Sequence, residues 1–142
     1  MDQQNIGLRN VTWGWATMFL GALSGTILMA WSFNGPFPEP PGFENYVDLS
    51  RRMTRLAHIA LFMVPLINIA IGREIDRLRI SSVWKEIASW SAIVGMIGIP
   101  LGLLLGALVH YQLKYVAMMP SYALLLSLMI MAVGAVRARN HS

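Results

Sequence analysis

Four stretches of the chain contain no Asp, Glu, Lys or Arg, and they constrain the fold more than any other feature. They cover residues 10–38, 56–72, 87–113 and 115–136. A helix that crosses a bilayer needs about 17–25 predominantly apolar residues, so each stretch can hold one. A soluble chain of 142 residues could not hide four such helices in one small core. The sequence predicts an all-α integral membrane four-helix bundle, with helices over about 11–33, 53–72, 87–109 and 116–136.

The composition agrees with a lipid environment. Hydrophobic residues make up 56% of the chain and charged residues 13%, whereas an average soluble domain has about 25% charged residues. The chain has no cysteine, which excludes disulfides, iron–sulfur clusters, zinc–thiolate sites and covalently attached haem. No glycine-rich phosphate-binding motif is present. One transmembrane domain over residues 1–142, with no nucleic-acid partner, is the simplest organisation.

Basic residues are divided unevenly between the two sides of the predicted bundle. Four spans place both termini on one side, together with the 73–86 loop. That side carries Arg9, Arg73, Arg77, Arg79, Lys85, Arg137 and Arg139, whereas the other carries Arg51, Arg52, Arg55 and Lys114. An excess of positive charge marks the cytoplasmic side. We therefore expect a bacterial inner-membrane protein with cytoplasmic termini and, because its first residues are polar, no cleavable signal.

The outward-facing loop over residues 34–52 is rich in proline. Pro36, Pro38, Pro40 and Pro41 follow one another closely. This density precludes a helix and favours an extended, polyproline-like path. A linker between two spans is the preferred interpretation, and a docking strip for another subunit is the alternative.

Small residues recur at four-residue spacing in two of the predicted helices. They are Gly21 and Gly25 in the first helix and Gly98, Gly102 and Gly106 in the third. Such spacing lets helix backbones, or a flat ligand, approach closely, and helix packing is the commoner explanation. Pro65 and Pro100 lie inside predicted helices and are expected to bend them. Asn68 lies within the second span, where we expect an interhelical hydrogen bond rather than a ligand contact.

The side chains with chemistry available inside the predicted spans or at their ends are histidines rather than carboxylates. No Asp or Glu lies inside a span, and Glu86 sits at the edge of the third. This argues against a proton-coupled transporter, which normally needs a buried carboxylate. No grouping typical of a hydrolase is visible, so no catalytic residue is predicted. His58 and His110 both lie toward the outer side, and two histidines are the minimum for axial ligation of a non-covalent haem.

The surroundings of the two histidines extend this prediction to a b-type haem whose iron both would ligate. Gly106 and Gly102 lie below His110 and would leave room for a porphyrin. Phe62 lies one turn below His58. The rise along the two helices allows the imidazoles to reach similar depths near the outer face. The sequence therefore predicts a haem between the second and third helices.

Three arginines on the outer side are candidates for pairing with haem propionates. Arg51, Arg52 and Arg55 cluster there, and Arg55 lies one turn from His58. Guanidinium groups pair with carboxylates in a bidentate geometry, which suits propionates. The alternative is that these arginines balance the acidic residues of the loop or meet lipid phosphates.

Other roles for the histidines are also open. His110 can serve as an interfacial hydrogen-bonding residue beside Tyr111. His58 can bond a neighbouring helix, or it can ligate a macrocycle whose second ligand belongs to another subunit. Each of these alternatives is compatible with the positions of the residues in the sequence.

The start of the second predicted helix resembles a known group of proteins in two adjacent pieces. The first reads Arg51-Arg52-Met53-Thr54-Arg55-Leu56-Ala57-His58-Ile59, and the second Met63-Val64-Pro65-Leu66-Ile67-Asn68. This segment resembles small bacterial inner-membrane proteins associated with respiratory cytochrome complexes. It is also similar to the second helix of haem–copper oxidase subunit I, where an outer-side histidine ligates a low-spin haem. His58 is the matching position, but the chain has too few spans for a catalytic subunit. The resemblance implies an accessory or electron-transfer subunit.

The leading functional hypothesis is therefore a membrane subunit of a respiratory or other electron-transfer complex. It would bind haem b near the periplasmic face and pass electrons between a partner redox subunit and the quinone pool. The partners expected are other membrane subunits, lipid and a periplasmic cytochrome. A cofactor-free structural subunit of a larger complex is the second hypothesis, and a small oligomeric transporter is the third.

Overall fold

The computed structural model describes residues 6–31, 35–45 and 48–139, and these form an all-helical structure. Four helices are long and apolar enough to cross a membrane. They are α1 (Ile6–Trp31), α2 (Leu49–Glu74), α3 (Ser82–Leu108) and α4 (Met118–Arg139). Two stretches of 3₁₀ helix, η2 (Ile75–Arg77) and η3 (Tyr111–Ala117), lie after α2 and before α4. The prediction of a four-helix, multi-pass membrane protein is confirmed.

The helices begin at different residues from those predicted. α1, α2 and α3 start four or five residues earlier than expected, at Ile6, Leu49 and Ser82. The predicted starts directly follow the charged or polar residues Asn10, Arg52 and Glu86, but a helix can continue beyond the hydrocarbon into the polar layer. The opposite holds for α4, because residues 116–117 belong to η3. The predicted end of the first helix, at residues 32–33, lies outside the described residues.

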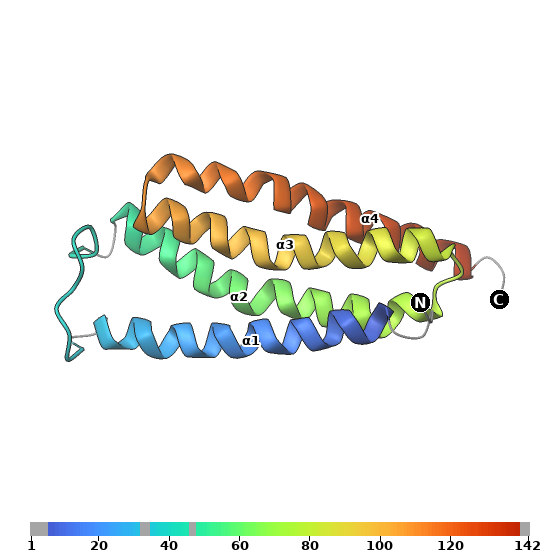
Figure 1. Cartoon of the computed structure of the whole chain (residues 1–142), viewed down its shortest axis with the longest axis horizontal. Helices are drawn as coiled ribbons and strands as arrows, with labels where there is room; N and C mark the ends of the chain where they lie inside the picture. Colours follow the sequence, from blue (N-terminus) through green and yellow to red (C-terminus); the bar gives the residue numbers. More distant parts are fainter. Residues whose placement is uncertain (1–5, 32–34, 46–47, 140–142) are drawn as a thin grey trace.

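The helices pack in chain order. α1 packs on α2, α2 on α3, and α3 on α4, with a smaller contact between α1 and α3. In Figure 1 the starts of α1 and α3 and the ends of α2 and α4 lie together, as an even number of spans requires. We call this the basic end, defined by Arg9, Arg73, Lys85 and Arg137. The opposite end, which carries the loop over residues 35–45, is called the loop end.

The face of α1 that packs on α2 is small and polar rather than apolar. Two rows of residues repeat every seven positions, namely Gly7, Gly14 and Gly21 and then Asn10, Thr17 and Ser24. All but Ser24 are buried, whereas Trp15, Phe19 and Leu20 on other faces are exposed. A methyl group added at Gly21 would lie 2.9 Å from the carbonyl oxygen of Leu61. Small residues thus let α1 approach the backbone of α2, as is typical of membrane helices.

The glycines of α3 form the corresponding contact with η3 and α4. An added methyl group at Gly98 would overlap Pro120, and one at Gly102 would lie 2.6 Å from the backbone nitrogen of Ala117. At Gly106 the nearest atoms belong to Lys114, whose Cβ would be 2.9 Å away. The row therefore packs against protein along its whole length. This contact supports helix packing as the explanation for the glycine spacing.

The interior between the helices contains two groups of buried apolar side chains. The first, toward the basic end, consists of Ile6, Ile71, Ile75, Ala88, Ala92 and Ile130. The second, nearer mid-span, consists of Val64, Ile93 and Met96. Pro65 and Pro100 lie inside α2 and α3, as predicted, and both are buried.

The proline-rich loop folds back onto the helices instead of running straight. Gly42 adopts a φ of +83°, which glycine reaches without steric cost. This conformation turns the chain so that Phe43 is buried, with its ring 6.4 Å from that of Trp31. Arg51 of α2 then donates to the carbonyl of Phe43 at 2.9 Å. The described part of the loop is tied to α1 and α2, which favours a linker over a docking strip.

Candidate functional site

His58 lies between α1 and α2, and its hydrogen bond to Ser24 of α1 bears on its tautomer. The Ser24 hydroxyl is 2.9 Å from Nδ1 of His58 and 2.7 Å from the carbonyl oxygen of Gly21. A carbonyl can only accept, so the single hydroxyl hydrogen goes to Gly21. In the arrangement that makes both contacts hydrogen bonds, the Ser24 oxygen accepts from His58, and a neutral imidazole then carries its proton on Nδ1. The lone pair of the ring is therefore on Nε2, the arrangement typical of a metal-ligating histidine.

The Nε2 atom of His58 has no hydrogen-bond partner among the described residues. No buried side-chain nitrogen or oxygen in this part of the chain lacks a partner, so Nε2 reaches the molecular surface. Gly25 makes room for the ring, because an added methyl group there would lie 3.0 Å from Cε1. The Phe62 ring packs edge-on to the imidazole at 5.3 Å. His58 is thus held on three sides and leaves one ligating atom accessible.

His110 occupies a different environment. It follows the end of α3, is exposed, and accepts a hydrogen bond from the backbone nitrogen of Gln112 at 3.4 Å. Its ring lies against that of Tyr111, with 4.9 Å between centroids. This is the interfacial hydrogen-bonding role that was the alternative interpretation.

The structure does not bring His58 and His110 together. His58 faces α1, whereas His110 contacts residues that lead into η3. Their depths also differ. His58 is nine residues beyond the start of α2, about 13 Å along the helix axis, whereas His110 lies past the end of α3. Figure 1 shows that α2 begins and α3 ends at the same end of the molecule. A haem ligated by both rings would require a rearrangement of the helices.

The predicted neighbours of the haem are also engaged elsewhere. Gly102 and Gly106 face Ala117 and Lys114, and this contact fills the space that a porphyrin would need. Arg51 forms an ion pair with Glu39 at 3.2 Å, which was the alternative to propionate binding. Arg52 is exposed, and Arg55 is half-buried one turn from His58. The residues present do not fit a haem held within a single chain, although His58 alone retains the geometry of a ligand.

The basic half of the molecule holds a polar cluster that links α1, α2 and α3. The Asn10 side chain donates to the Asn68 side chain at 2.7 Å, and Asn68 donates back to the Asn10 carbonyl at 2.9 Å. The Ser89 hydroxyl donates to the Asn10 side chain, and Asn10 reaches the Ser89 carbonyl at 3.3 Å. Asn68 also contacts the Met96 sulfur at 3.3 Å. The predicted interhelical hydrogen bond of Asn68 is confirmed.

Arg9 extends this cluster toward the basic end. Its guanidinium donates to Ser89 at 2.7 Å and to Glu86 at 2.6 Å. It also lies 4.4 Å from the centroid of the Trp90 ring, a cation–π contact between residues of α1 and α3. We call Arg9, Asn10, Asn68, Glu86 and Ser89 the polar cluster. Its buried members are all hydrogen-bonded, so the cluster acts as an interhelical clamp.

Sequence reasoning identified Asn68 but missed its partners. Asn10 lies just before the predicted start of the first helix, Ser89 lies in the first turn of the third, and neither is singled out by its position. The seven-residue spacing of Asn10, Thr17 and Ser24, in phase with three glycines, was the available signal. This spacing marks one continuous helix face, which must be buried if it is not to meet lipid.

The described residues show no group of three or more histidines and carboxylates that could hold a metal ion. Comparisons of the chain with known protein families, with curated proteins and with solved structures found no match. The geometry around His58 and the polar cluster is therefore the basis for any statement about function.

Proposed function

We propose that the chain is a subunit of a bacterial inner-membrane electron-transfer complex in which His58 would hold the iron of a b-type haem. The observation that carries this proposal is the pair of hydrogen bonds at Ser24. They place the imidazole proton on Nδ1 and leave Nε2 accessible. Haem supplies one-electron transfer when it is bound. Electrons would pass between a partner redox subunit, such as a periplasmic cytochrome, and the quinone pool.

A further ligand of the iron would come, in this proposal, from another subunit. Nε2 has no hydrogen-bond partner among the described residues and is not fully buried. His110, which follows the end of α3, contacts Tyr111 and Gln112 instead. Arg55, one turn from His58, is the arginine best placed to meet a propionate. Such a site becomes complete only when the subunit is assembled with its partner.

The orientation of the subunit follows from its charge. The basic end carries most of the arginines and lysines, so it faces the cytoplasm by the positive-inside rule. Both termini then lie on the cytoplasmic side. His58 lies in the half of the bilayer nearer the loop end, which is the periplasmic half. The site is therefore within reach of an electron donor in the periplasm.

A comparison of two histidine variants tests the proposal. The complex, purified in mild detergent, is expected to give a reduced-minus-oxidised spectrum of a b-type haem. His58→Ala should abolish the contribution of this subunit, and His110→Ala should leave it unchanged. Ser24→Ala removes the acceptor of the Nδ1 proton and should weaken haem affinity about 10–100-fold. A spectrum unaffected by His58→Ala, or a subunit that assembles without haem, contradicts the proposal.

A cofactor-free structural subunit is the second candidate, and a specific observation favours it. The polar cluster and the glycine rows are fully used in packing one helix on another. A subunit of this kind would contribute rigid helices to a larger complex. Pyridine-haemochrome analysis of the purified complex separates the two candidates. No haem in excess of that held by the partner subunits would favour the structural role.

A further inference from the structure

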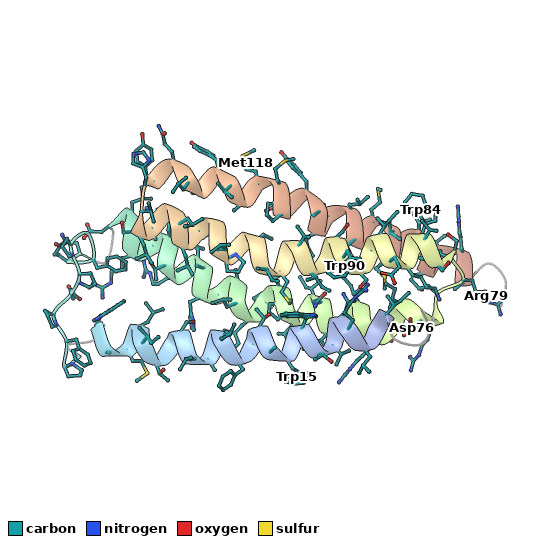
Figure 2. The ribbon with its side chains drawn as sticks, in the orientation of Figure 1. Trp15, Asp76, Arg79, Trp84, Trp90 and Met118 are labelled. Carbon is teal, nitrogen blue, oxygen red and sulfur yellow. The ribbon has the colours of Figure 1, made fainter. Side chains whose placement is uncertain are left out.

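A small apolar cavity opens between the start of α3 and the end of α4. It has a volume of 190 Å³ and is lined by Ile80, Trp84, Met129, Ile130, Val133 and Arg137. Figure 2 shows Trp84 at the basic end, while Met118, at the start of α4, lies at the loop end. The cavity belongs neither to the surroundings of His58 nor to the polar cluster. It therefore requires a separate explanation.

The size and lining of the cavity select the kind of occupant. Pockets that hold a whole small molecule usually measure about 300–1,000 Å³, so this one suits only part of a larger ligand. Five of its six lining residues are apolar, and the sixth is Arg137. An occupant must therefore combine an apolar segment with a group that an arginine can bind. A phosphate ester on a hydrocarbon chain has this composition.

The cavity lies at the level of the lipid headgroups. α3 has 27 residues, a length of about 40 Å, which exceeds the roughly 30 Å hydrocarbon core of a bilayer. Trp84 lies in its first turn, and Arg137 lies near the end of α4. Tryptophan and arginine at helix ends are typical of the interface, where the indole and the guanidinium meet headgroups.

The charge at the basic end favours a lipid with net negative charge. Arg9 and Arg77 form ion pairs with Glu86 and Glu74. Arg137 has no carboxylate partner among the described residues. The described side chains of the basic end comprise six basic and three acidic groups. They are Arg9, Arg73, Arg77, Arg79, Lys85 and Arg137, and Glu74, Asp76 and Glu86. A zwitterionic headgroup would bring an ammonium group into this excess of positive charge, whereas an anionic one would reduce it.

From these observations we infer that the cavity binds one anionic phospholipid. An acyl segment lies against Met129 and Val133, and the phosphate accepts hydrogen bonds from Arg137. The bound lipid fills the angle between α3 and α4 and links the last turn of α4 to the rest of the molecule. This inference does not depend on haem binding, and it would hold for a structural subunit as well.

Native mass spectrometry of the purified chain with equal amounts of phosphatidylglycerol and phosphatidylethanolamine tests the inference. The wild type should retain phosphatidylglycerol preferentially. Arg137→Gln should lower the ratio of the two retained lipids about fivefold, as expected for the loss of one interfacial arginine. Val133→Trp should fill the cavity and release the lipid without changing the charge.

Arg73→Gln is the matched control, because it removes an exposed arginine of the same end that does not line the cavity. It should leave the lipid ratio within error of the wild type. Circular dichroism of each variant verifies that the helices are intact. Equal retention of both lipids by the wild type, or equal effects of Arg137→Gln and Arg73→Gln, overturns the inference. Selective retention of a free fatty acid would overturn the assignment of a phospholipid.

Discussion

The two ends of the molecule use polar side chains in opposite ways. At the basic end, the polar cluster joins three helices, and each buried polar atom has a partner. Toward the loop end, Ser24 and His58 form a single contact between two helices, and Nε2 remains accessible. A saturated network has no capacity left for a ligand, whereas a partly satisfied imidazole does. The comparison assigns stability to one end and chemistry to the other.

The strongest test of the stabilising role of the polar cluster is the replacement of Asn68. Asn68→Ala deletes its bonds to Asn10 and the contact with Met96, and it leaves the buried Asn10 amide with only the Ser89 carbonyl, 3.3 Å away, as an acceptor. We expect a loss of about 2–3 kcal/mol in the free energy of unfolding, because interhelical hydrogen bonds in membranes contribute about 0.6–2 kcal/mol each. Unfolding of both proteins in mixed detergent micelles measures this loss of free energy.

Thr26→Ala is the control for this prediction. Thr26 is exposed, and its hydroxyl bonds only the carbonyl of Leu23 in its own helix. Its replacement should change the unfolding free energy by less than about 0.5 kcal/mol. Similar losses for both variants would show that the polar cluster is not a clamp.

Two glycines provide the second comparison. At the basic end, a methyl group at Gly72 would lie 2.6 Å from the backbone oxygen of Gly7, which cannot move without moving α1. Toward the loop end, a methyl group at Gly25 would lie 3.0 Å from Cε1 of the His58 ring, a contact that a side-chain shift of a few tenths of an ångström relieves. Gly72→Ala should therefore cost about 1–3 kcal/mol of stability, and Gly25→Ala under about 1 kcal/mol. Thermal unfolding in detergent measures both effects, and the reverse order would contradict the comparison.

The ion pairs give the smallest expected effects. The Arg9 side chain is 19% exposed and bonds Glu86 and Ser89, whereas Arg77 is 76% exposed and bonds Glu74 alone. Arg9→Gln should lower the free energy of unfolding by about 1–2 kcal/mol. Arg77→Gln should change it by less than about 0.5 kcal/mol, since exposed pairs contribute little. High salt screens ion pairs that are accessible to solvent. The loss of unfolding free energy for Arg9→Gln should therefore approach that for Arg77→Gln in high salt only if solvent reaches the Arg9 pair.

The number and type of the helices could be predicted because long charge-free stretches have few other solutions. The ends of the helices could not be predicted in this way, because the helices continue past the charge-free stretches. Arg9 and Lys85, for example, lie in the first turns of α1 and α3. The role of Asn68 was predictable because an amide within a span must find a partner. Its partner Asn10 was not, since the residues before it are polar and the helix was expected to begin after it.

The candidate haem site shows the limit of reasoning from depth. The number of residues between an interface and a histidine estimates height, but it does not give the direction in which the side chain points. His58 faces α1 because Ser24 forms a hydrogen bond with its ring and Gly25 leaves room for it. His110 lies beyond the end of α3, where the chain turns into η3. The binding of haem b stays a prediction, now with His58 as its basis.

The repeat of small and polar residues along α1 bears on how the protein is made. α1 leaves the ribosome before α2, so its buried face first meets either lipid or whatever helix is nearby. Asn10 has no partner for its side-chain amide in an acyl environment. The same face would suit a second copy of α1, because a glycine every seventh residue is self-complementary. Rapid insertion of the following hairpin would then decide between the correct fold and premature self-association of nascent chains.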